Sequence, residues 1–99
     1  MAMIVSAAVR LTKPNGETIT IAGPRHHHCY ETIAALNPEL LKQCRYEGLL
    51  EEGFVDKDNH FLDRDHAYGV ARATNQLPAA LIQFKTEHNE RILFSEDLY

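Results

Sequence analysis

The residues best suited to chemistry stand together in one segment, Gly23-Pro24-Arg25-His26-His27-His28-Cys29. Proline favours the first position of a helix because it lacks the N–H group that would go unpaired there. A helix that begins at Pro24 would place Arg25 and the three histidines in its first turn. The unpaired N–H groups and the dipole of a helix start attract anions. We therefore predict an anion site here, for a phosphate or a carboxylate.

The three histidines cannot all serve one ligand, because consecutive helical residues point about 100° apart. We assign His26 and His27 as candidate catalytic residues for proton transfer, and His28 as a ligand-binding residue beside Arg25. Two alternatives stay open. One is an ordinary polar helix start with a packed histidine. The other is a metal site, although helical zinc motifs space their histidines four residues apart. We predict no metal and no other cofactor.

A second candidate region begins at Asp63. This residue is typical of a helix N-cap, and Asp65 suits a first helical turn, which would by itself explain the pattern. The sharper hypothesis is that Arg64 binds a second phosphate or a ribose. Tyr68, four residues further on, would then stack on the same ligand, and Tyr30 is the other tyrosine placed to stack on a base.

The C-terminal segment, Ser95-Glu96-Asp97-Leu98-Tyr99, is the third candidate region. Its last two residues, Leu98 and Tyr99, are apolar, so we expect them to dock against the domain. Docking would let Glu96 or Asp97 orient a histidine or act as a general base, if the last strand pairs beside the first hairpin. Ser95 is a further ligand-binding candidate. The alternative is a solvated, frayed chain end.

The pattern of apolar and turn residues predicts the elements that position these side chains. Strands are expected at 3–11 and 17–21 around a Pro14-Asn15-Gly16 turn, and a second hairpin at 53–62. Helices are expected at 24–36, 38–45 and 64–75, and a short strand at 91–94. Residues 47–52 fit a helical turn or a loop, and residues 80–84 a strand or a helix end. The result is an α+β fold: a small single domain, 1–99, with an N-terminal β-hairpin followed by helices packed on a short antiparallel sheet.

Composition limits the classes of function. A chain of 99 residues suits one domain, and 24% charged residues is ordinary for a globular protein. The formal net charge is −4, and positive charge exceeds negative charge only in residues 1–30. We therefore expect no binding to bulk nucleic acid. No apolar run approaches the roughly 20 residues that span a bilayer, so we expect a cytoplasmic protein without a membrane partner. Two cysteines without CxxC spacing indicate reduced thiols.

Four segments in this order resemble small proteins encoded by bacteriophages and prophages: IVSAAVRL, GPRHHH, EGFVDKDNHFLDRDHAYGVA and LFSEDLY. The likeness covers most of the chain, and it includes an Arg-His-His segment, a Gly-Phe-x6-Phe-x2-Arg-x2-Ala segment and a Ser-Glu-Asp-Leu ending. This sequence has Phe94 where the resemblance leads one to expect tyrosine, and His66 in place of an acidic residue. The resemblance implies a phage-type accessory protein in the cytoplasm of a host cell.

Two hypotheses of function follow, with catalysis left open as a third. In the first, the protein binds, and in the catalytic version cleaves, a phosphate-bearing nucleotide such as a host signal used in antiviral defence. A domain this small has little surface with which to enclose a nucleotide, so we expect a homo-oligomer that completes the site. In the second, the protein inhibits a host defence protein through an acidic surface. The carboxylates of that surface are Glu47, Glu51, Glu52, Asp56 and Asp58.

Overall fold

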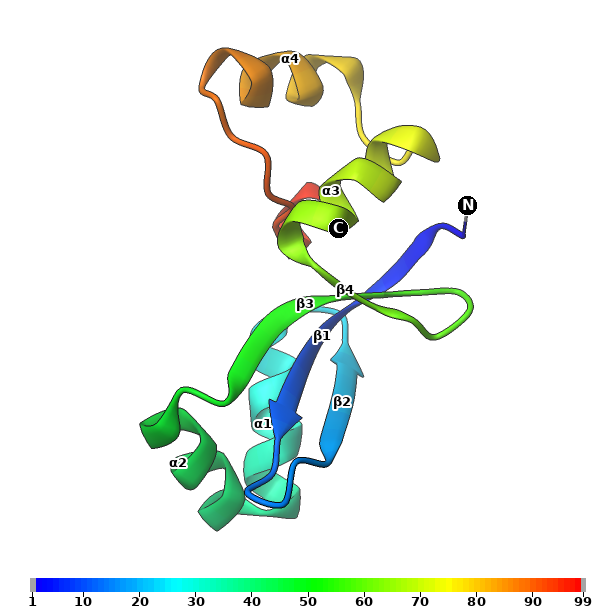
Figure 1. Cartoon of the computed structure of the whole chain (residues 1–99). Helices are drawn as coiled ribbons and strands as arrows, with labels where there is room; N and C mark the ends of the chain where they lie inside the picture. The colour runs from blue at the N-terminus through cyan, green and yellow to red at the C-terminus, as the bar shows by residue number, and fades with distance from the viewer. Residues whose placement is uncertain (1, 99) are drawn as a thin grey trace.

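The computed structural model describes residues 2–98. The chain opens with the expected hairpin, formed by strands β1 (Ile4–Thr12) and β2 (Thr18–Gly23). The connection turns at Gly16, whose φ of +90° is a conformation that glycine adopts without steric cost. Strand β1 also pairs with β3 (Leu50–Asp56), and β3 pairs with β4 (Phe61–Asp63). The result is one antiparallel sheet in the order β2-β1-β3-β4 (Figure 1).

Helix α1 (His26–Leu36) begins two residues later than predicted. The prediction that Pro24 opens the helix is wrong, because β2 continues through Gly23, which still pairs with Ala7. Pro24 then turns the chain, and Arg25 is the N-cap, with extended φ and ψ angles of −134° and 158°. The three histidines do occupy the first turn of α1, but Arg25 precedes it.

The next elements follow their sequence signals closely. Helix α2 (Pro38–Glu47) is capped by Asn37, whose side chain accepts a hydrogen bond from the backbone N–H of Leu40. It ends at Gly48, in the left-handed conformation. Of residues 47–52, Glu47 closes α2, but 50–52 belong to β3, so the helical-turn and loop readings are both wrong for those three residues. Helix α3 (Arg64–Ala73) is capped by Asp63 as predicted, through a 2.8 Å bond from the N–H of His66 to Oδ1.

The last third of the chain departs most from the prediction. Residues 80–84 belong to helix α4 (Ala79–Glu87), so the helix reading of that segment is the correct one. The predicted strand at 91–94 is wrong: the segment is irregular and leads into a short 3-10 helix, η1 (Ser95–Asp97). Leu93 is buried there, and its N–H bonds to the carbonyl of Arg64. The apolar character of this segment therefore reflects the burial of Leu93 against α3 and not pairing in the sheet, whose strands are β1 to β4.

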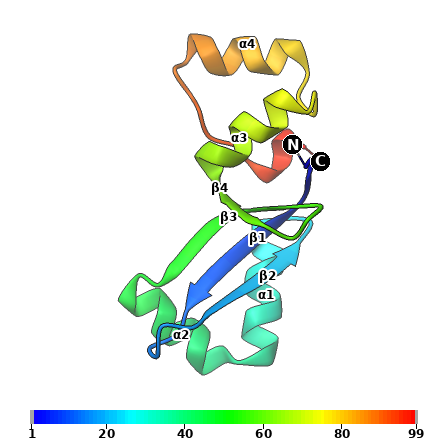
Figure 2. The ribbon, with the colours of Figure 1, turned by 45° about the vertical axis from the view of Figure 1, so that its right-hand side comes forward.

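Two hydrophobic clusters lie along the sheet. At the end of the sheet next to α3, Ile4, Ala7 and Phe54 pack with residues of that helix and with Leu93. Further along, Val9 and Leu11 of the same β1 pack with α1 and α2. The views in Figures 1 and 2 agree that α1 and α2 lie at one end of the molecule and α3, α4 and η1 at the other. The architecture is α+β, and the sheet is what joins its two ends.

No helix within residues 2–98 is long and apolar enough to cross a membrane. Both cysteines are free thiols in the interior, Cys29 and Cys44. Burial raises the pKa of each thiol above its ordinary value. Both thiols therefore pack as small apolar groups in the cluster under α1 and α2.

Candidate functional site

The three histidines at the start of α1 point to three different surroundings. His26 is buried, and its Nε2 donates a 2.8 Å hydrogen bond to the carbonyl of Gly53. His27 is exposed, and His28 is half-buried. The Nδ1 atom of His28 is buried and finds no hydrogen-bond partner within the described residues. One histidine thus packs on the sheet, as in the polar helix start that the sequence left open, and the three do not converge on one ligand.

Arg64 and Tyr30 meet at a carboxylate of the sheet. Glu52 accepts a 2.7 Å hydrogen bond from the Tyr30 hydroxyl and a second one from the Arg64 guanidinium. Arg64 also donates to the carbonyl of Leu93 and lies over the ring of Phe94. These two candidate ligand-binding side chains are therefore already engaged with groups of the protein itself.

The pKa values in this cluster follow from those contacts. Burial alone would raise the pKa of Glu52, but the Tyr30 and Arg64 hydrogen bonds and the nearby His26 outweigh burial and lower it. Burial together with the bond to Glu52 raises the pKa of Tyr30 to about 12. At neutral pH the cluster holds a carboxylate, a guanidinium and a neutral phenol, which is a stable arrangement for a structural link between β3, α1 and α3.

The two C-terminal carboxylates have separate partners. Glu96 lies 4.0 Å from Arg25, next to the histidine turn, whereas Asp97 forms a 3.0 Å ion pair with Lys85 of α4. Within residues 2–98 neither carboxylate holds a histidine. Ser95 is buried, and Leu98 packs against the cluster beneath α3, as the sequence led us to expect. Tyr99 lies outside the described residues.

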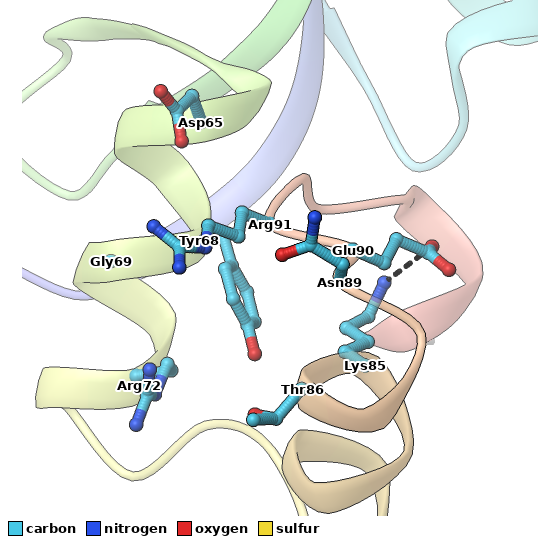
Figure 3. A pocket seen from close by; sticks show the side chains of 9 residues that line it. All are labelled: Asp65, Tyr68, Gly69, Arg72, Lys85, Thr86, Asn89, Glu90 and Arg91. Carbon is cyan, nitrogen blue, oxygen red and sulfur yellow. Dashed lines mark hydrogen bonds and ion pairs between the residues drawn. The ribbon is translucent and has the colours of Figure 1, made fainter.

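A pocket of about 380 Å³ opens between α3, α4 and the segment 89–91, away from α1 (Figure 3). Tyr68 forms part of its wall. Its side chain is directed from α3 toward α4, and Thr86 lies beyond the hydroxyl in the view of Figure 3. Two guanidinium groups also line the pocket, Arg72 from α3 and Arg91 from the last loop. The guanidinium of Arg72 is 5.8 Å from the centre of the Tyr68 ring.

The Tyr68 hydroxyl is the unusual group of this pocket. Tyr68 is only 5% exposed, and its hydroxyl oxygen is buried without a hydrogen-bond partner in the part of the chain that the structure describes. A hydroxyl of this kind costs about 1–3 kcal/mol relative to one that is paired. Buried polar groups are nearly always paired, so this unpaired hydroxyl next to a pocket calls for an explanation.

Lys85 forms the floor between this pocket and the C-terminal segment. It is 2% exposed, and its ammonium group donates to Glu90, to Asp97 and to the carbonyl of Ile92 at 3.0–3.1 Å. Burial alone would lower the pKa of Lys85, but the two carboxylates outweigh it and raise the pKa. Lys85 therefore stays protonated, and the carboxylates of Glu90 and Asp97 balance its charge inside the fold. The positive charge offered to a ligand comes from Arg72 and Arg91.

Among residues 2–98, one group of side chains has the donors to hold a metal ion: Asp56, Asp58 and His60, at the tip of the hairpin between β3 and β4. The Asp56 carboxylate already stabilises the turn of that hairpin. Its Oδ1 accepts from the N–H groups of Asp58 and His60, both at 2.9 Å. These bonds are the main cause of the lowered pKa of Asp56. They explain the cluster as turn chemistry.

Sequence reasoning singled out Tyr68 but not its partners in the pocket. Arg72 follows Tyr68 by four residues, so one helical turn on the same face was a signal present in the sequence. Arg91 and Thr86 carried no comparable signal, because only the return of α4 across α3 brings them near Tyr68. The pair predicted to share a ligand, Arg64 and Tyr68, is separated: Arg64 faces Glu52, and Tyr68 faces α4.

Comparison with models of protein families matches residues 3–99 to the family described as Phage T4 y16D protein. Neither the curated proteins nor the solved structures gave a match.

Proposed function

The chain belongs to the Phage T4 y16D protein family, and we propose that it captures a small phosphate-bearing molecule in the pocket between α3 and α4. One observation carries this proposal. The Tyr68 hydroxyl is buried, without a partner among the described residues, in the wall of a pocket that Arg72 and Arg91 also line. A phosphate oxygen would give the hydroxyl its acceptor.

The chemistry of the two arginines supports the same ligand. A guanidinium presents several N–H donors in one plane, which match the oxygens of a phosphate, and it keeps its charge at any physiological pH. The pocket volume of about 380 Å³ lies at the lower end of the range for small-molecule sites. That space suits a mononucleotide better than a polymer, in agreement with the acidic net charge of −4.

The surroundings of the pocket favour capture over cleavage. His26 and His27, the candidates for proton transfer, lie on α1 and not in the lining of this pocket. The carboxylates Glu96 and Asp97 pair with Arg25 and Lys85. In a phage protein inside a host cell, the natural target of such capture is a nucleotide signal of antiviral defence.

Isothermal titration tests the proposal with inorganic phosphate, pyrophosphate and a panel of ribonucleotides that includes cyclic nucleotides and ADP-ribose. We expect at least one of these anions to bind. Replacing Arg72 by glutamine should weaken that binding by about tenfold to a hundredfold, because it removes a charge-assisted bond worth roughly 1.5–3 kcal/mol.

Arg45→Gln is the matched control. Arg45 is also an exposed helical arginine over a tyrosine ring, 5.2 Å from the centre of Tyr30, but it lies outside the pocket. Binding should survive this change. Failure of every anion to bind at millimolar concentration, or equal weakening by both substitutions, would rule the pocket out.

The second hypothesis is inhibition of a host protein through an acidic surface of five carboxylates, and three of these have partners in the fold. Glu51 pairs with Arg10, and Glu52 with Arg64. Asp56 is 8% exposed and holds its hairpin turn. Glu47 and Asp58 are exposed and would carry such a surface. Recovery of one host protein by the Arg72→Gln variant in a lysate pull-down would favour this hypothesis.

A further inference from the structure

One face of α3 lines the pocket, and its residues follow the helical repeat: Asp65, Tyr68, Gly69 and Arg72. Positions i, i+3, i+4 and i+7 fall on one side of a helix. Asp65 and Arg72 stand at the two ends of this stripe, about 10 Å apart at a rise of 1.5 Å per residue. The pocket therefore has an anionic end and a cationic end, with Gly69 between them.

Gly69 has no structural reason to be glycine. It lies inside α3, where glycine is unfavourable, and a Cβ added there would meet nothing within 4 Å. Most larger residues would favour the helix more than glycine does, and a side chain here would project into the space in front of α3. Gly69 lines the pocket there (Figure 3), and it also borders a second hollow that is lined by Leu62, His66 and Val70. The missing side chain leaves an uncovered stretch of backbone at the middle of the site.

We propose that this stretch seats the base of a guanine nucleotide, an inference that rests on the proposed capture of a phosphate-bearing molecule. The phosphate lies at Arg72 and Tyr68, and the planar base lies against the backbone at Gly69. The Asp65 carboxylate accepts hydrogen bonds from the base. Within residues 2–98 the Asp65 side chain has no hydrogen-bond or ion-pair partner, and it is exposed.

The choice of guanine follows from the donors that a carboxylate can accept. Guanine presents two neighbouring N–H donors, N1–H and the N2 amino group, which match both oxygens of Asp65 at once. Adenine presents one amino group beside a ring nitrogen that is itself an acceptor, and this nitrogen would face the carboxylate unfavourably. Arg91 extends from the last loop toward α3 in Figure 3, where its guanidinium can cover the face of the base.

Titration with GMP, AMP and ribose 5-phosphate tests the inference. We expect GMP to bind at least about tenfold more tightly than AMP, the discrimination typical of a paired base edge. Asp65→Asn should remove this preference, since an amide no longer presents two acceptors. Equal binding of all three compounds would overturn the guanine inference and leave phosphate capture standing. If none of the three binds, and inorganic phosphate and pyrophosphate also fail, both proposals fall.

A second pair of variants keeps the test independent of Asp65. Gly69→Leu fills the space in front of α3, whereas Ala73→Leu adds the same side chain to the same helix at an exposed position outside the pocket. We expect Gly69→Leu to weaken GMP binding at least about tenfold while pyrophosphate binding stays within about twofold. Ala73→Leu should bind both compounds as the unmodified protein does. Unchanged GMP affinity in Gly69→Leu would overturn the placement of the base.

Discussion

At the scale of single residues, the two tyrosines with low exposure differ in what their hydroxyls do. The Tyr30 hydroxyl donates to Glu52, whereas the Tyr68 hydroxyl is buried without a partner among the described residues. A paired hydroxyl stabilises a fold by about 1 kcal/mol, and a buried unpaired one destabilises it. The same substitution should therefore have opposite effects at the two positions.

We predict that Tyr68→Phe leaves the free energy of unfolding equal to that of the unmodified protein or higher. Tyr30→Phe, the matched comparison, should lower it by roughly 1 kcal/mol because Glu52 loses a donor. Urea denaturation measures both values. Tyr68→Phe should also weaken pyrophosphate binding if the hydroxyl serves the ligand. A clear loss of stability in Tyr68→Phe would show that the hydroxyl has a partner in the folded protein.

Gly69 allows a second prediction at this scale. Gly69→Ala should raise the free energy of unfolding by about 1 kcal/mol, because alanine favours a helix interior and its Cβ meets no other atom. For a domain of this size that corresponds to a rise in melting temperature of about 4–8 °C. Ala73→Gly, on the same helix, should lower it by a similar amount. A fall in the melting temperature of Gly69→Ala would mean that the glycine is needed for packing.

At the scale of elements, the C-terminal 3-10 helix η1 is held mainly by one ion pair. Asp97 bonds to Lys85, and its Oδ2 also accepts from the N–H of Phe94, which closes the turn of η1. Glu96, its neighbour, is 69% exposed and only reaches Arg25 at 4.0 Å. The two adjacent carboxylates thus differ sharply in burial, which makes them a natural pair for comparison.

We predict that Asp97→Asn lowers the free energy of unfolding by about 1.5–3 kcal/mol, because the buried Lys85 ammonium loses a charged partner. Glu96→Gln should change it by less than about 0.5 kcal/mol, as expected for an exposed pair. Thermal unfolding monitored by circular dichroism measures both. Equal melting temperatures for the two variants would contradict the assigned role of Asp97.

At the scale of the whole molecule, the fold is longer than a compact domain of this length. Its radius of gyration is 14.3 Å, against the about 13 Å expected for 100 residues. The excess reflects the two hydrophobic clusters set along one sheet. Glu52 links the two ends, since it accepts from Tyr30 of α1 and from Arg64 of α3. Disrupting this link should affect the stability of both ends.

Acid should disrupt the link. The pKa of Glu52 is lower in the folded chain than its ordinary value of 4.5, so its contribution is complete above pH 4.5 and is lost as pH falls through the lowered pKa. We predict a melting temperature that declines with acid below pH 4.5, and a shallower decline in Glu52→Gln. Glu51→Gln, on the same strand, should keep the original slope. Parallel slopes for all three proteins would show that Glu52 is not responsible.

Several features could be read from the sequence because short-range chemistry decides them. The Asn-Gly turn, the caps at Asn37 and Asp63 and the second hairpin all depend on residues a few positions apart. The same holds for the α+β class and for the helical turn that carries the three histidines. Membership in a phage protein family was also recognisable from the order of its segments, and the family comparison confirms it.

The candidate pocket was decided by tertiary structure, because its groups come from positions far apart in the chain. An arginine or a carboxylate looks equally available in a sequence, whether it will bind a ligand or pair internally. In the folded chain Arg64 forms an ion pair with Glu52, and Asp97 forms one with Lys85. Among residues 2–98 the Tyr68 hydroxyl has no partner, and it lies in the same pocket as Arg91 from the last loop. Sequence alone determined which groups were present, and only the packing of α4 on α3 determined which of them face a pocket.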